Sequence, residues 1–203
     1  KKGGNAVDAA IAVKFALAVV YPNAGNLGGG GFMVYRDKSG IVNSLDFREK
    51  APAKAQRDMY LDKDGNPITD LSLYGQLAAG VPGSVAGMDE AFKKYGSLSW
   101  KELLEPAIAL AEQGFPITAQ QAGEFNRYQE RFKKHNPNGA AIIRDAEWKA
   151  GDLFVQKELG ETLKRIAEHG RDGFYKGKTA EYIIAEMKKG NGIISLEDLA
   201  NYQ

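Results

Sequence analysis

The hydrophobic pattern of the first twenty residues predicts a buried helix. Residues 6–21 are apolar at almost every position, and Asp8 and Lys14 are the exceptions. Asn5 is suited to cap this helix, Asp8 complements its N-terminal dipole, and Pro22 is expected to end it. A helix that is apolar on all sides is expected to lie between two layers of structure.

A β-hairpin is expected next, after four consecutive glycines at residues 28–31. Apolar residues dominate 32–36 and recur through 41–47, and the connecting Asp-Lys-Ser-Gly sequence at 37–40 is typical of a hairpin turn. A buried helix followed by a hairpin favours a layered α/β or α+β sandwich.

The rest of the chain is predicted to be mostly helical. Ser99 and Glu102 have the spacing of a capping box, and Gly114 is the expected stop of that helix. We interpret residues 1–203 as part of a single domain, with the buried helix and the hairpin in residues 1–56 and a mostly helical portion in 57–203. The helices expected in that portion span 84–95, 99–114, 118–134, 156–168, 179–189 and 196–202.

Composition narrows the function classes. The 203 residues carry 27 Lys and Arg against 26 Asp and Glu, so overall charge favours neither nucleic acid nor a membrane surface. Residues 1–56, however, carry eight basic and four acidic side chains, which mildly favours an anionic ligand near the hairpin. The absence of cysteine excludes disulfides, zinc-thiolate sites and a cysteine nucleophile.

Arg48 is the candidate binding residue. It follows the second strand, and its planar guanidinium is suited to hold a carboxylate with two parallel hydrogen bonds. Asp46 lies two residues earlier on the same face of the strand, so the two side chains can instead form an ordinary ion pair. On these residues alone the ion pair is the favoured interpretation, and carboxylate binding is the alternative.

No complete catalytic site, metal site or cofactor site is predicted. The glycine run follows a helix and opens a strand, the reverse of a dinucleotide motif, and it lacks the Gly-Lys-Ser/Thr of a phosphate loop. Close backbone packing or positive φ angles explain it better. His135 falls in an expected polar turn at 133–137, and His169 precedes Gly170 at a helix end, where a cation complements the dipole.

Six segments in order resemble the γ-glutamyltranspeptidase family. They extend over essentially the whole chain, and it is their order that makes the resemblance specific. The segments are GGNAVDAA (3–10), PNAGNLGGGGF (22–32), DFREKAP (46–52), GVPGSVAG (80–87), FYKG (174–177) and ISLEDL (194–199).

The resemblance implies an α+β fold, the four-layer αββα sandwich of N-terminal-nucleophile hydrolases. The family is made as a precursor that cuts itself into large and small subunits, and this chain resembles part of the large one. It is expected to lack its own start and to end before the cleavage point. The nucleophile is the threonine that begins the small subunit, so none of Thr69, Thr118, Thr162 or Thr179 is assigned that role.

The resemblance also implies that Arg48 binds the α-carboxylate of a γ-glutamyl substrate such as glutathione, without a cofactor. The partner would be the small subunit, whose strands should pair with those of this segment, so we do not expect the segment to fold alone. A periplasmic or secreted location is implied, with a cytoplasmic one as the alternative. The rival functions are a cephalosporin-acylase-like enzyme, a poly-γ-glutamate-processing enzyme, and a non-catalytic binding or structural domain.

Overall fold

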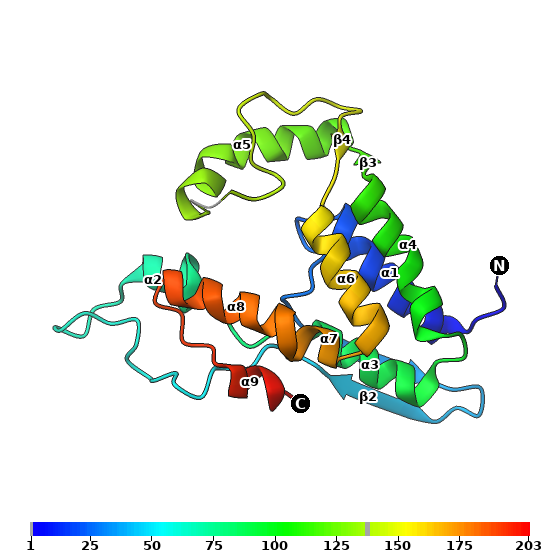
Figure 1. Cartoon of the computed structure of the whole chain (residues 1–203). Coiled ribbons are helices and arrows are strands. Elements are labelled where there is room, and N and C mark those ends of the chain that lie inside the picture. Colours follow the sequence, from blue (N-terminus) through cyan, green and yellow to red (C-terminus); the bar gives the residue numbers. More distant parts are fainter. Residues whose placement is uncertain (1, 137–138) are drawn as a thin grey trace.

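Three helices packed side by side form the centre of the fold (Figure 1). In the computed structural model, which describes residues 2–136 and 139–203, helix α4 (Trp100–Gln113) lies between α1 (Ala6–Val20) and α6 (Lys157–His169). Helix α3 (Ser84–Tyr95) also packs on α1 and contacts the hairpin.

The hairpin consists of β1 (Phe32–Arg36) and β2 (Val42–Asp46), which pair antiparallel with Phe32 opposite Asp46. A second, two-residue pair joins β3 (Phe115–Pro116) to β4 (Leu153–Phe154). The remaining elements are α2 (Thr69–Leu73), the short 3₁₀ helix η1 (Gln76–Ala78), α5 (Ala119–His135), α7 (Asp172–Tyr175), α8 (Gly177–Lys189) and α9 (Leu196–Ala200).

The α+β class, the first helix, the hairpin and the six later helices are confirmed, with small differences at their ends. Elements α2, η1 and α7 and the β3–β4 pair were not predicted. Each spans five residues or fewer, which is too short to show a hydrophobic period.

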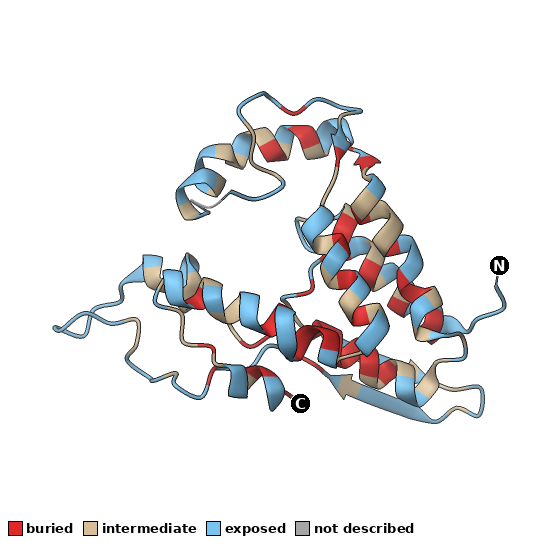
Figure 2. Ribbon diagram, viewed as in Figure 1, coloured by how far each residue is buried: buried red, intermediate tan, exposed pale blue. Residues whose placement is uncertain are grey.

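The expectation that the first helix is buried on all sides was wrong for the described part of the chain. Ile11, Phe15 and Val19 face the core and are fully buried, but Val13 is 55% exposed and Leu17 is 39% exposed. Helix α1 packs on α3 and α4, and its ribbon carries exposed as well as buried positions (Figure 2). An apolar stripe is thus left open on the other side.

Four helices begin with the same capping arrangement. In each, the N-cap side chain accepts a hydrogen bond from the backbone N–H three residues on, and that residue's side chain accepts one from the N-cap N–H. Two otherwise unpaired donors are satisfied at each helix start. The pairs are Asn5 with Asp8, Ser99 with Glu102, Thr118 with Gln121, and Ser195 with Asp198.

Ser99→Ala is expected to lower the free energy of unfolding by about 1 kcal/mol, because the first turn of the central helix α4 loses its side-chain acceptor. Urea unfolding of the complete protein measures this. Ser72→Ala is the control, since the Ser72 hydroxyl is exposed and bonds only within its own turn. A loss for Ser99→Ala no larger than that of the control would contradict the capping role.

Asp8 does more than cap its own helix. Its buried carboxylate also accepts hydrogen bonds from the Ser97 N–H at 2.9 Å, the Ser97 hydroxyl at 2.5 Å and the Leu98 N–H at 3.3 Å. Burial by itself would raise the pKa of Asp8, but these bonds and that of Asn5 outweigh it and lower the pKa to about 2. The ionised carboxylate therefore ties the start of α1 to the loop before α4.

Candidate functional site

Arg48 lies two residues beyond the end of β2 with its side chain exposed. Its guanidinium carbon lies 5.8 Å from the centre of the Phe32 ring. Among the described residues the guanidinium forms no ion pair. The Asp46 carboxylate instead accepts a hydrogen bond from the backbone N–H of Arg48 at 3.0 Å. The ion-pair interpretation was therefore wrong, because Asp46 turns back onto the main chain.

The glycine run allows the segment around Arg48 to approach closely. A Cβ atom on Gly30 would lie 2.5 Å from the Phe47 carbonyl oxygen and 2.8 Å from the Arg48 Cα. One on Gly31 would lie 2.9 Å from the Phe47 ring. None of the four glycines has a positive φ. The packing explanation is confirmed for Gly30 and Gly31 but not for Gly28, where a Cβ would meet no atom within 4 Å, and the positive-φ alternative is wrong for the whole run.

The start of α3 supports the same segment from another side. Gly83 and Ser84 both donate their N–H groups to the Gly29 carbonyl at 2.8 Å. Two further backbone hydrogen bonds, of 2.8 and 3.1 Å, join Lys50 to Val81. The backbone that follows Arg48 is thus held by a segment remote in sequence, and the glycine run that packs against Arg48 is held by the start of α3.

Tyr202 completes these contacts and was missed by the sequence reasoning. Its hydroxyl donates to the Arg48 carbonyl at 2.7 Å, across a separation of 154 residues. The sequence predicted Tyr202 only as the end of the last helix, which in fact ends at Ala200. No local pattern connects two residues so far apart, so no sequence signal pointed to this contact.

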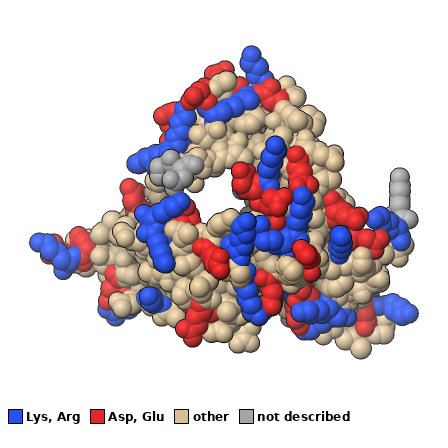
Figure 3. All heavy atoms as spheres, viewed as in Figure 1, with Lys and Arg blue, Asp and Glu red and all other residues tan. Residues whose placement is uncertain are grey.

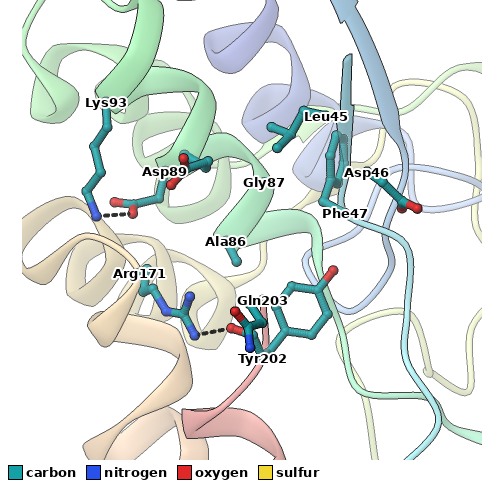
Figure 4. A pocket seen from close by; sticks show the side chains of 11 residues that line it. Leu45, Asp46, Phe47, Ala86, Gly87, Asp89, Lys93, Arg171, Tyr202 and Gln203 are labelled. Atoms are coloured by element: carbon teal, nitrogen blue, oxygen red, sulfur yellow. Dashed lines mark hydrogen bonds and ion pairs between the residues drawn. The ribbon is translucent and has the colours of Figure 1, made fainter. Parts of the chain in front are cut away.

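A cavity of about 290 Å³ lies beside the end of β2, and Arg48 is not among the residues that line it. Figure 4 shows Phe47 and Tyr202 on one side of this cavity, with Asp89, Lys93 and Arg171 on the other. Asp89 is paired with Lys93 at 2.6 Å. The guanidinium of Arg48 therefore does not line this cavity.

Both histidines lie at helix ends, and the hydroxyls of two of the threonines bond to the backbone. His135 is the last residue of α5, where it stacks on Tyr74 with ring centres 4.8 Å apart; residue 137 of the turn predicted there lies outside the described residues. His169 ends α6 as expected. The hydroxyl of Thr118 caps α5, and that of Thr179 donates to the Gly173 carbonyl.

Within the described residues, acidic and histidine side chains nowhere gather in a group of three that would suit a metal ion. The helices there are also too short or too polar to cross a membrane. Basic and acidic side chains are interspersed on the face seen in Figure 3.

The sequence profile of the family described as Gamma-glutamyltranspeptidase matches residues 1–203. The chain belongs to this family. A curated relative, the glutathione hydrolase proenzyme of Escherichia coli (strain K12), is 49% identical over 205 residues, covering all of this chain and 35% of the relative.

Solved γ-glutamyltranspeptidases share the fold. The Helicobacter pylori enzyme is 50% identical with a TM-score of 0.94, over all of this chain and 58% of that one. The enzyme from Pseudomonas nitroreducens, solved with L-DON, is 46% identical with a TM-score of 0.88, over all of this chain and 59% of that one. The chain spans about a third of the length of the E. coli glutathione hydrolase proenzyme. That relative therefore contains a further portion beyond the matched segment.

Proposed function

We propose that this chain is the large-subunit portion of an enzyme that cleaves γ-glutamyl amides such as glutathione. The observation that carries the proposal is the exposed guanidinium of Arg48, which pairs with no carboxylate of the described residues and lies on a firmly held strand end. The family profile matches the chain over all 203 residues. The names of the E. coli and H. pylori relatives support the same reaction class.

Arg48 would hold one end of the substrate. A guanidinium forms two parallel charge-assisted hydrogen bonds with a carboxylate, which fixes both position and orientation. With the α-carboxylate held there, the γ-carbonyl carbon is confined to the region within reach of the glutamyl side chain from Arg48. Such positioning lowers the entropic part of the barrier to attack.

The chemistry itself would come from a threonine at the start of the small subunit. Its hydroxyl oxygen attacks the γ-carbonyl carbon while its own α-amine takes the proton, and the C–N bond breaks as the leaving amine is protonated. The γ-glutamyl ester that results is then attacked by water, releasing glutamate, or by an acceptor amine. Donors for the developing oxyanion would also come from that subunit.

The open side of the hairpin supports a site divided between two subunits. Phe32 is 65% exposed and Val34 is 75% exposed on the face opposite the core. Apolar strand surface of this kind, with unpaired edges, is normally covered by further structure. A four-layer αββα sandwich completed by the small subunit would cover both this face and the open stripe of α1. A separate prediction, from the family resemblance, is a periplasmic or secreted location.

Arg48→Lys tests the proposal in the complete, matured protein. Lysine keeps the charge but loses the planar fork, so we expect kcat/KM for a γ-glutamyl anilide to fall by about 5- to 150-fold, the equivalent of about 1–3 kcal/mol. Arg36→Lys, at an exposed arginine on the same hairpin, is the control and should change kcat/KM less than about twofold.

Two outcomes would count against the proposal in different ways. Wild-type activity with an unchanged kcat/KM for Arg48→Lys would reject the carboxylate-binding role of this residue. No release of the anilide by the matured wild-type protein would reject the reaction itself.

A further inference from the structure

Both backbone groups of Arg48 are hydrogen-bonded, although its side chain forms no hydrogen bond or ion pair with the described residues. Its N–H donates to the Asp46 carboxylate, and its carbonyl accepts from the Tyr202 hydroxyl at 2.7 Å. The direction in which the side chain leaves the main chain is set by these two peptide groups. The arginine side chain has four rotatable bonds, so its guanidinium can reach many positions. A fixed backbone reduces that number and so favours the position that binds a ligand.

Tyr202 is held more firmly than its place near the end of the chain would suggest. It is only 4% exposed, and its ring stacks on Tyr175 with centres 5.7 Å apart and planes 15° from parallel. The Tyr175 hydroxyl in turn donates to the Pro82 carbonyl at 2.6 Å. Arg171 donates to the backbone carbonyl of Tyr202 at 2.5 Å (Figure 4). The hydroxyl that reaches Arg48 thus belongs to a side chain with little freedom to move.

The hydroxyl is also kept in the form that donates. Burial and the nearby carboxylates of Asp46 and Glu49 raise the pKa of Tyr202, so its proton is retained at neutral pH. Gly83 leaves the space this arrangement needs. A Cβ atom at Gly83 would collide with both the Tyr202 hydroxyl and the Phe47 carbonyl.

We infer that Tyr202 is a positioning residue for substrate binding: its hydroxyl fixes the backbone of Arg48 so that the guanidinium meets the substrate carboxylate. The inference rests on the proposed function. It adds a residue that touches no substrate itself and acts through the main chain of the residue that does.

The test is a double-mutant cycle in the complete, matured protein, with kcat and KM measured for a γ-glutamyl anilide. Tyr202→Phe keeps the stacked ring and removes only the hydroxyl. It should lower kcat/KM by about 3- to 10-fold, mainly through KM, the size expected for one neutral hydrogen bond. In an Arg48→Lys background the same change should lower kcat/KM less than about twofold, because the fork that Tyr202 positions is already gone.

A purely structural role would show a different pattern. In that case Tyr202→Phe would lower kcat/KM by the same factor in both backgrounds, or would not lower it at all, and either result overturns the inference. Tyr60→Phe is the matched control. It removes a hydroxyl that donates to the Leu77 carbonyl at 3.1 Å and should leave KM unchanged.

Arg171→Gln provides a second variant if Tyr202→Phe does not accumulate as folded protein. It releases the backbone of Tyr202 without touching the hydroxyl, and KM should rise at least about twofold. An unchanged KM would overturn the inference. The Arg48→Lys single variant, in which Tyr202 is unchanged, reports separately on the proposed function. Failure of the proposed function is therefore distinguishable from failure of the inference about Tyr202.

Discussion

Gly30→Ala should lower kcat/KM of the complete protein for a γ-glutamyl substrate by about 100-fold, the scale reported for misplacing a binding group by about 1 Å. The added Cβ would lie 2.5 Å from the Phe47 carbonyl oxygen and 2.8 Å from both the Arg48 Cα and the Glu49 nitrogen. All three are backbone atoms, so no side chain can rotate out of the way. The strand end that carries Arg48 must move instead.

Gly28→Ala is the control within the same glycine run. A Cβ at Gly28 meets no atom within 4 Å, and its φ is not positive, so kcat/KM should change less than about twofold. Thermal unfolding of both variants separates a displaced Arg48 from a failure to fold. If folded Gly30→Ala kept the wild-type kcat/KM, the strand end would not be what determines the position of Arg48.

Asp8→Asn is expected to lower the free energy of unfolding by about 3 kcal/mol, the scale for a buried charged group that loses its hydrogen bonds. The substitution keeps the size of the side chain but replaces an acceptor oxygen with an NH₂ group. In place of Oδ2 that group would face the backbone N–H of Asn5, and in place of Oδ1 it would face the backbone N–H groups of Ser97 and Leu98. At least one donor would be left without a partner in a buried place.

Urea unfolding of the complete protein measures the effect of Asp8→Asn. Asp64→Asn is the control, because Asp64 is exposed in a polar turn and should change the free energy of unfolding by less than about 0.5 kcal/mol. Equal effects for the two variants would show that the Asp8 network does not hold α1 to the loop before α4.

The same carboxylate gives stability a defined pH dependence. The pKa of Asp8 is about 2 in the folded protein, below its ordinary value of 3.8, so the folded state favours the ionised form. Its contribution is therefore fully present above about pH 5 and is lost as the pH falls through 3.8 towards 2. Wild-type protein should lose more stability over that interval than Asp8→Asn does.

The elements that could be predicted from the sequence are those determined by local chemistry. Ser99 and Glu102 predict a helix start because their spacing fits a capping box, and the polar turn at 37–40 predicts the hairpin. Arg48 could be selected because its residue type and place suit a carboxylate. Its role in binding remains a prediction.

The contacts that were missed join distant segments. Asp8 was predicted only to complement a helix dipole, because nothing near it in the sequence indicates that Ser97 and Leu98 fold back onto it. The Asp46–Arg48 pair was expected from their shared strand face, but the short Asp46 side chain reaches a backbone N–H more easily than a guanidinium. Neither outcome can be read from residue type and spacing.

The hydrogen bond from Tyr202 to Arg48 also has a consequence for the order of biosynthesis. Its two residues are 154 positions apart, and ribosomes add about 5–20 residues per second. Arg48 is therefore made about 8–30 s before its tyrosine partner exists. During that interval the glycine-rich hairpin and its arginine belong to a nascent chain in which the final backbone contact cannot yet form.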